Sequence, residues 1–433
     1  MALKDPLQRL VVRTTEALVR FLLRRQIRIP PSASDRAMEI AARTDELNVA
    51  AEAYFANIAE PAYLLGKPYS DPVYFPRFLH EMGVLTEYLR VGPGDTVLEM
   101  GAGTCWVSHF LNLFGCHTIS VDVSPTALAL GRQLFRRDRR TRWELGPVFL
   151  PYDGHRLPLA DGVCDRVIIH DAYHHFPNPD EILAELYRVL RPGGIVAMSE
   201  PGREHSLAEA TQREVALTGV LENDVVVERL EETARAVGFT RATVVPVRLQ
   251  APEVPARDFT AFLQGEGFVA FWQSLAKELL HFHFILLYKG EPRVTTRKPG
   301  RLAARIEPAG EARSGRLTAA VGEEVRLECA VRNLGDTVWL GETVHPPGVT
   351  RLGVHLLATA EDEPQDWARA ILPTDLSPGE STTLTFTVRA PDQPGMYRLV
   401  LDMVAEGLYW FAAQGSETTV VDFEVHEVRD DLA

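Results

Sequence analysis

The sequence predicts an α/β protein: a Rossmann-like, doubly wound and mostly parallel sheet, with a helical region before it and an all-β sandwich after it. Between residues 95 and 289, apolar runs such as "TVLEM", "HTISVDV", "DRVIIHD" and "GIVAMSE" alternate with helical segments. This is the rhythm of parallel strands joined by right-handed crossovers. Beyond residue 312, apolar residues recur at every second position, as in strands with one buried face. A chain of 433 residues is long enough for two separate cores.

The first 90 residues are expected to form a helical region or lid. Within residues 5–28, apolar side chains from Leu7 to Leu22 fall on one helical face and arginines form a second stripe. Such a helix either lies on an anionic membrane surface or packs on its own domain or a partner. The packed alternative is favoured, because amphipathic helices are common in globular proteins. No long apolar stretch or secretory signal is recognisable, so a soluble, cytoplasmic protein is expected.

Composition and periodicity predict four parts. A stretch rich in Pro, Gly and Arg follows "HFHFILLYKG" and is typical of a linker. After it, "EVRLECAVRN" and "TLTFTVRA" alternate strictly, and turn signals such as "SPGE" separate the runs. About seven antiparallel strands are expected there. The predicted parts are a helical region at 1–90, an α/β domain at 91–290, a linker at 291–311 and a β-sandwich at 312–428.

The distribution of charge excludes a nucleic-acid partner. From Arg305 to the end the chain carries 22 acidic and 10 basic residues, and therefore −12 of the formal net charge of −14. Neither half has the basic surface that phosphate backbones require. The four cysteines are too few and too scattered for a disulfide framework or a C-x-x-C metal site. They are expected to be small buried hydrophobes.

A glycine turn follows the first strand of the α/β domain, in "VLEMGAGTCW" at residues 97–106. Glycine tolerates positive φ and lets backbone N–H groups approach a ligand closely. Dinucleotides and S-adenosylmethionine both fit such a turn. A dinucleotide fingerprint needs G-x-G-x-x-G, whereas here Trp106 stands three residues after Gly103. The bulky ring argues against close passage of a pyrophosphate.

Four motifs in order separate the two interpretations. After Glu99 and the glycines come Asp122 at the end of the next strand, "YDGHRLPLADGVCDRVIIHDAYHHFPNP" and "RVLRPGGIVAMSEPG". This order resembles class I S-adenosylmethionine-dependent methyltransferases of the methyltransferase type 11 kind, from about Asp95 to Gly202 and more loosely to Gly290. The family often has a third glycine where this chain has Cys105.

The resemblance implies roles for eight residues in binding S-adenosylmethionine. The turn would lie under the methionine part, with an acidic residue bonding its amino group. An aspartate would accept hydrogen bonds from both ribose hydroxyls, a task that suits a carboxylate because both oxygens are acceptors. The structural alternatives are helix caps or loop acids. The implied cofactor-binding residues are Glu99, Gly101, Gly103, Asp122, Val123, Asp153, Gly154 and His170, where Asp153 takes the adenine amino group and His170 lies beside the methionyl end.

Methyl transfer to a hydroxyl also needs a base, and histidine titrates nearest to neutral pH. The candidate catalytic residues are His174 and His175 after the fourth strand and Glu200 after the fifth. Paired histidines before "FPNP" also recur in this family regardless of substrate. His170, Asp171, His174, His175 and Glu200 could together bind a metal, but no second motif supports a site. No metal is therefore predicted.

The acceptor is the least determined part of the prediction. "SEPGREHS", "GVLENDV" and "ARAVGF" resemble methyltransferases of bacterial glycan and polysaccharide biosynthesis. The C-terminal part resembles the accessory Ig-like domains of such systems. A hydroxyl of a saccharide or glycolipid is the expected acceptor. The alternatives are a lipid or small natural product, or an inactive methyltransferase fold that serves as a scaffold. The oligomeric state stays open. Four C-terminal aromatic residues would either stack on sugars or fill the sandwich core: Trp339, Tyr409, Trp410 and Phe411.

Overall fold

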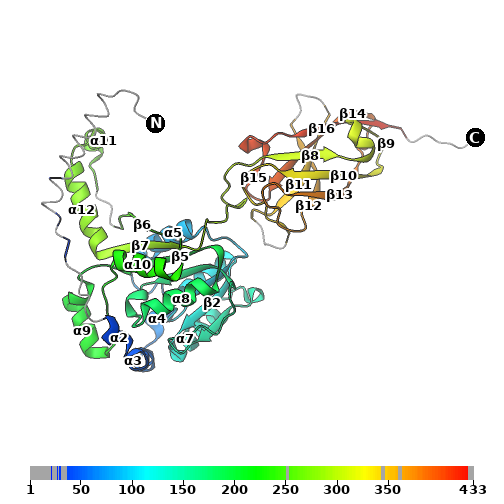
Figure 1. Ribbon diagram of the computed structural model, residues 1–433. Helices are drawn as coiled ribbons and strands as arrows, with labels where there is room; N and C mark the ends of the chain where they lie inside the picture. Colours follow the sequence, from blue (N-terminus) through cyan, green and yellow to red (C-terminus); the bar gives the residue numbers. More distant parts are fainter. Residues whose placement is uncertain are drawn as a thin grey trace, which may run out of the picture. The chain divides into compact units, whose positions relative to one another are not determined.

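The computed structural model describes residues 37–249, 253–342, 347–358 and 363–427, together with residues 21, 27, 29 and 30. The chain divides into two compact units, residues 1–91 with 95–292 and residues 92–94 with 293–433. Each is an architecture of its own (Figure 1). Apart from residues 21 and 27, the predicted amphipathic helix of residues 5–28 lies outside the described residues.

The first unit is built on a sheet that has seven strands among the described residues, in the order β3-β2-β1-β4-β5-β7-β6. Strands β1 to β5 run parallel, and β7 runs antiparallel to both of its neighbours. This topology confirms the predicted doubly wound, mostly parallel sheet. The strands are β1 (Thr96–Met100), β2 (His117–Asp122), β3 (Val148–Pro151), β4 (Cys164–His170), β5 (Leu190–Pro201), β6 (Arg241–Val245) and β7 (Phe282–Tyr288).

Helices cover both faces of this sheet, because successive side chains of each strand point to opposite faces. In β1, Val97 belongs to the core with α5, α6 and α7, whereas Leu98 and Met100 belong to the core with α8 and α10. In β4, Ile168 joins the first core and its neighbours join the second. The helices are α5 (Phe75–Leu89), α6 (Trp106–Phe114), α7 (Pro125–Arg137), α8 (Pro179–Val189) and α10 (Val227–Val237).

Helices α3, α4 and α9 contribute residues near the carboxyl ends of the parallel strands. The carboxylate of Glu52, on α3, accepts hydrogen bonds from the hydroxyls of Ser124 and Thr126 at the start of α7. This contact ties α3 to the sheet domain. No helix among the described residues is long and apolar enough to cross a membrane. The remaining helices of this unit are α2 (Ala37–Ala41), α3 (Thr44–Ala56), α4 (Ala62–Leu65), α9 (Glu209–Thr218), α11 (Phe259–Leu263) and α12 (Phe268–His281).

The second unit is all-β. Its described strands form one sheet in the order β13-β10-β8 and another in the order β12-β11-β14-β16-β9, with β15 paired to β14. Apolar side chains of both sheets share one core, so the sheets pack face to face. The strands are β8 (Ala304–Pro308), β9 (Arg316–Ala320), β10 (Glu324–Asn333), β11 (Thr350–Leu357), β12 (Gln365–Ile371), β13 (Ser381–Arg389), β14 (Gly395–Ala405), β15 (Tyr409–Trp410) and β16 (Thr419–His426).

Details of this unit differ from the sequence-based expectation. The described part of residues 312–428 has eight strands where about seven were expected, and β9 pairs with β16 in parallel. Part of the segment expected as a linker forms β8, because its backbone pairs with β10. Trp339 and Phe411 are both 0% exposed, with ring centroids 5.3 Å apart. They fill the core, so of the two alternatives for these rings the structure supports the sandwich core and not stacking on sugars.

Candidate cofactor and acceptor site

A cavity of about 240 Å³ lies at the carboxyl ends of β1, β2 and β4. In a doubly wound sheet this edge is where ligands bind, because the loops that follow the parallel strands diverge there. Helix α3 contributes to the opposite wall. Of the eight residues predicted to bind the cofactor, six line this cavity: Glu99, Gly101, Gly103, Asp122, Val123 and His170.

The glycine turn is held against the end of β2. Gly101 and Gly103 have φ values of 70° and 49°, which side chains rarely adopt. A Cβ at Gly101 would lie 2.7 Å from the Cβ of Ala172, so the position also requires glycine for space. The backbone N–H of Gly103 donates to Asp122 Oδ2 over 2.7 Å. The turn and the aspartate therefore form one rigid piece of the cavity floor.

Asp122 is held through both carboxylate oxygens. Oδ1 accepts the backbone N–H of Ser124 over 2.8 Å, and Oδ2 accepts that of Gly103. Burial raises the pKa of Asp122 to about 6, although these N–H groups act in the opposite direction. Each carboxylate oxygen has a further lone pair. The side chain can therefore accept two more hydrogen bonds from a ligand without moving.

Glu99 lies at the end of β1 beneath the first turn of α6. Its Oε2 accepts the backbone N–H of Ser108 over 2.8 Å, and the helix N-terminus favours a negative charge there. Burial raises the pKa of Glu99 to about 7, and its hydrogen bonds to Ser108 partly offset this. A cationic ligand group would restore the ionised form.

His170, at the end of β4, is supported from below by α5. Its Nε2–H donates to Glu81 Oε2 over 2.6 Å, and Arg77 donates to the other oxygen of Glu81. The ring makes edge contacts with Trp106 and Phe78 at centroid distances of 5.0 and 5.8 Å. Burial lowers the pKa of His170, but the hydrogen bond and charge of Glu81 outweigh it, so the pKa is raised. The imidazole is therefore fixed in one orientation at the cavity wall.

Asp153 and Gly154 do not line the cavity in the described part of the chain. The Asp153 carboxylate accepts the backbone N–H groups of His155 and Arg156, each over 2.8 Å, so it caps its own loop. Asn48 of α3 donates to the Asp153 carbonyl. Their neighbour Tyr152 lines the cavity instead.

The three predicted catalytic residues differ in their access to the cavity. Glu200 is fully buried at the end of β5 and accepts the backbone N–H groups of Ala172, Tyr173 and His174. It also accepts His174 Nδ1–H over 2.8 Å. Glu200 is not among the described residues that line the cavity, and its oxygens hold the loop after β4 in place, so the geometry gives it a positioning role and does not support its prediction as a base.

His174 is also withdrawn from the cavity. Its side chain is 4% exposed and lies between Glu200 and Glu222. Burial lowers the pKa of His174, but the hydrogen bonds to these two carboxylates outweigh it and raise the pKa to about 10. Hydrogen bonds to His174 and His205 correspondingly lower the pKa of Glu222 to about 2, against the effect of burial.

His175 alone of the three lines the cavity. Its Nδ1 lies 2.6 Å from the carbonyl of Leu221, and because a carbonyl only accepts, Nδ1 carries the proton. Nε2 then bears the free lone pair. Burial and the neighbouring His174 lower the pKa of His175. The neutral imidazole is therefore the favoured form.

Sequence reasoning missed much of the opposite wall. Tyr54 and Phe55 come from α3, Lys67 from the loop after α4, and Glu214 and Glu222 from α9 and the loop after it. Burial lowers the pKa of Lys67, and Asp171 acts against this. None of these residues belongs to a motif with fixed spacing. Glu222 stands in the quoted "GVLENDV", but only the fold brings that segment against the paired histidines.

Comparison with known proteins identifies the kind of domain. Residues 98–198 match the model of a methyltransferase domain. The arsenite methyltransferase of Halobacterium salinarum is 27% identical over 165 residues, which are 37% of this chain and 41% of that protein. The demethylmenaquinone methyltransferase of a Parafrankia species is 35% identical over 126 residues, 27% and 50% of the two chains. The malonyl-[acyl-carrier protein] O-methyltransferase of Methylococcus capsulatus is 32% identical over 151 residues, 34% and 53%. The chain spans about half the length of the curated relatives it matches.

Solved structures are similar at lower identity. A putative methyltransferase of Haloferax volcanii, in complex with a methyltransferase activator, aligns at 18% identity and a TM-score of 0.39 over 54% of this chain and 100% of its own. Phosphoethanolamine N-methyltransferase 2 of Haemonchus contortus, in complex with S-adenosyl-L-methionine, aligns at 17% identity and a TM-score of 0.34, over 55% and 61%.

Proposed function

We propose that the protein is an S-adenosylmethionine-dependent methyltransferase that methylates a hydroxyl of a neutral acceptor, a saccharide or glycolipid. The observation that carries the proposal is the meeting of Glu99, Asp122 and His170 at the ends of three adjacent parallel strands around one cavity. The match of residues 98–198 to a methyltransferase domain supports the same activity.

The residues present suit the cofactor. Asp122 has lone pairs left for two ribose hydroxyls, and Glu99 offers a carboxylate to an ammonium group in a buried setting. The glycine turn leaves room beneath the methionine part. When bound, S-adenosylmethionine supplies an electrophilic methyl group, and the chain's own task is to place and activate the acceptor.

The charge of the wall favours a neutral acceptor. Asp171, Glu214 and Glu222 line the cavity, whereas Lys67 is a single cation among the described lining residues. Carboxylates accept hydrogen bonds from hydroxyls but repel an anionic acceptor. Arsenite is not proposed as the acceptor, because its soft arsenic centre favours thiolate ligands and the four buried cysteines are not among the described residues that line the cavity.

His175 is the residue proposed to activate the acceptor hydroxyl. A neutral imidazole nitrogen can do so by accepting the proton or by holding a metal ion that makes the hydroxyl more acidic. His174 and Glu200 position this loop rather than contacting the acceptor. Of the three candidate residues, His175 is therefore proposed to be catalytic, and His174 and Glu200 are proposed to position the loop.

The test is methyl transfer by the full chain from labelled S-adenosylmethionine to a panel of neutral saccharides and glycolipids. His175→Ala is expected to lower kcat by roughly 10²- to 10⁴-fold and to leave the Kd of the cofactor unchanged. Tight cofactor binding without transfer to any acceptor would instead indicate an inactive binding protein.

A further inference from the structure

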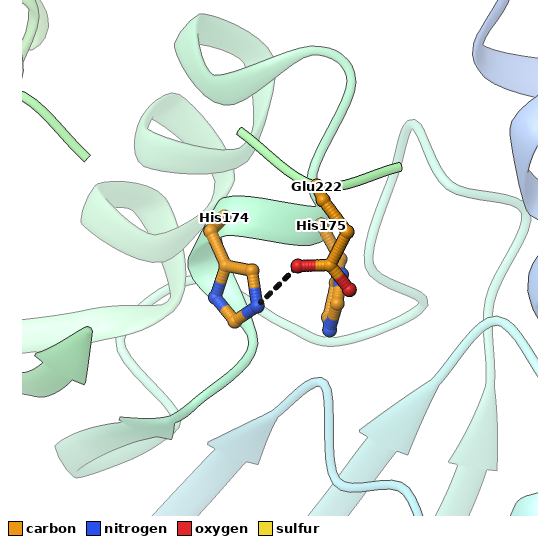
Figure 2. Close-up of side chains that lie close together, drawn as sticks. All are labelled: His174, His175 and Glu222. Carbon is orange, nitrogen blue, oxygen red and sulfur yellow. Dashed lines mark ion pairs between the residues drawn. The ribbon is translucent and has the colours of Figure 1, made fainter. Parts of the chain in front are cut away.

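We propose that His174, His175 and Glu222 bind one divalent transition-metal ion, with Zn²⁺ as the model ion, at the wall of the cavity. One ligand atom of each side chain lies within 4.8 Å of the other two. Figure 2 shows the imidazole of His174 directed at the Glu222 carboxylate, with His175 on its other side. The site rests on these contacts alone, whereas the role given to the ion also rests on the proposed methyl transfer.

The spacing of the donor atoms fits a small coordination sphere. His174 Nε2 lies 3.4 Å from Glu222 Oε2. Bonds of about 2.0–2.2 Å from Zn²⁺ to nitrogen and oxygen, in a tetrahedral arrangement, place neighbouring donors roughly 3.4 Å apart. An ion between these two atoms therefore needs little rearrangement. The two imidazole rings already lie close together, with centroids 3.9 Å apart.

Both histidines have the second hydrogen bond that metal-binding imidazoles require. His174 Nδ1–H donates to Glu200 over 2.8 Å, and His175 Nδ1–H donates to the Leu221 carbonyl over 2.6 Å. Such partners fix the ring orientation and make Nε2 the ligand atom, and at His174 the ion would displace the proton that Nε2 directs at Glu222 in the ion-free protein. The fully buried carboxylate of Glu200 thus orients the imidazole of His174 as a metal ligand.

Glu222 is also held from a second direction. His205 Nε2 lies 2.8 Å from Glu222 Oε2, so the carboxylate cannot swing away from the histidines. Two further carboxylates, those of Asp171 and Glu214, line the same cavity. A divalent cation offsets this accumulated negative charge more fully than imidazolium alone. Two imidazoles and a carboxylate select a transition metal over Mg²⁺.

The position of the site gives the ion a task in the proposed reaction. His175 and Glu222 line the cavity that also contains Glu99 and Asp122. A cation there lowers the pKa of an acceptor hydroxyl that it binds. The hydroxyl proton then passes to water, the new carbon–oxygen bond forms, and the electron pair of the broken sulfur–carbon bond stays on sulfur. The metal would thereby specify a hydroxyl, held at a fixed place, as the methyl acceptor.

The decisive experiment is calorimetric titration of the metal-free full chain, without a histidine tag, with ZnCl₂. We expect one ion per chain, and visible absorption bands of low-coordinate Co²⁺ when CoCl₂ replaces ZnCl₂. Glu222→Gln should weaken Zn²⁺ binding by at least about tenfold. The matched control is Glu214→Gln, which removes another cavity carboxylate, and its Zn²⁺ affinity should change by less than about threefold.

Both variants must still bind S-adenosylmethionine, which shows that the cavity is folded. Absence of stoichiometric Zn²⁺ binding, or equal weakening by the two variants, overturns the metal site. If Zn²⁺ binds as expected and chelator-treated protein transfers methyl groups at an undiminished rate, the site stands and its role in acceptor activation is wrong. If Zn²⁺ binds and no acceptor is ever methylated, the metal site stands and the proposed function fails.

Discussion

At the scale of single residues, the carboxylate of Asp122 offers a direct test of cofactor binding. Both oxygens are aligned by backbone N–H groups, so the side chain needs no reorganisation to accept ribose hydroxyls. Charge-assisted hydrogen bonds contribute on the order of 1–3 kcal/mol. Asp122→Ala should therefore raise the Kd of S-adenosylmethionine by about 5- to 150-fold, measured by calorimetry.

Asp153→Ala is the matched control, because its carboxylate caps a loop and lies outside the described cavity lining. The sequence assigns both Asp122 and Asp153 to the cofactor, whereas of the two only Asp122 lines the described cavity. We expect the Asp153 variant to change cofactor affinity by less than about threefold, because the carboxylate bonds only to its own loop. Equal loss of affinity in both variants would contradict this division.

The raised pKa of Glu99 predicts a pH dependence of cofactor binding. Without a ligand, the carboxyl of Glu99 has a pKa of about 7. An ammonium group binds the ionised form of this carboxyl preferentially. Below pH 7, Glu99 is protonated in the ligand-free protein and must lose this proton when the ligand binds. The affinity for S-adenosylmethionine therefore falls as the pH falls. We expect the Kd of S-adenosylmethionine to level off above pH 7, to rise by up to about tenfold per pH unit between pH 7 and pH 6, and to rise more steeply below pH 6, where Asp122 is protonated as well.

Glu99→Gln separates this effect from that of Asp122, whose pKa is about 6. In the variant, the pH dependence near 7 should vanish and a weaker one near 6 should remain. Calorimetry between pH 5.5 and 7.5 measures both profiles. A flat profile for the unaltered protein would show that the carboxyl of Glu99 is not coupled to the ligand.

What could be predicted of the site depended on sequence spacing. Glu99, Gly101, Gly103 and Asp122 stand at strand ends, where the periodicity itself locates the ligand edge, and the structure brings them together. Glu222 stands 47 positions after His175 in the sequence, and no local pattern links the two. Contacts of that kind arise from tertiary packing, which a single sequence does not reveal.

At the scale of elements, the packing at the start of α6 depends on two neighbouring positions, Cys105 and Gly131. Cys105 precedes the helix with φ of 58°, a conformation that costs a residue with a side chain roughly 1–2 kcal/mol. Its side chain fits because α7 has glycine at the contact: a Cβ at Gly131 would lie 2.4 Å from Cys105 Sγ. The side chain of Cys105 therefore requires glycine at position 131 on the neighbouring helix.

This pairing predicts non-additive effects on stability. Gly131→Ala should lower the free energy of unfolding by about 1–3 kcal/mol through overpacking. In the Cys105→Gly background the same change should cost less than about 1 kcal/mol, because alanine favours a helix and only the 3.2 Å approach to the Thr104 carbonyl oxygen remains. Urea denaturation of the two single variants and the double variant measures the coupling. Additive effects would show that the two positions do not compete for space.

The elements themselves were predictable where periodicity was strong. In β10 and β13, Leu327, Cys329, Leu384 and Phe386 are buried as their alternation predicts. Strand β8 was not predicted and falls within the expected linker. Ala304–Pro308 is too short to show an alternation of apolar and polar residues, and it becomes a strand because it pairs with β10. The parallel pairing of β9 with β16 joins segments about 100 residues apart, which no local signal reveals.

At the scale of the whole molecule, the two units differ in chemistry as well as in fold. Every described residue that lines the cavity belongs to the first unit, whereas residues 305–433 carry −12 of the formal net charge of −14. A fragment of residues 1–292 should therefore bind S-adenosylmethionine with the Kd of the full chain. Calorimetry on the fragment checks this, and a folded fragment that fails to bind where the full chain binds would contradict the division.

The last prediction concerns what the all-β unit adds to turnover. If it contributes only binding that is equal in the ground and transition states, its removal raises KM for a large acceptor and leaves kcat nearly unchanged. Its acidic surface would repel an acidic polysaccharide, so the comparison should use a neutral glycan and a short analogue of it. The fragment should process the short analogue like the full chain, once circular dichroism has shown that it is folded. A fall in kcat of roughly a hundredfold on the short acceptor would mean that the second unit helps to build the active site, and the modular interpretation would be wrong.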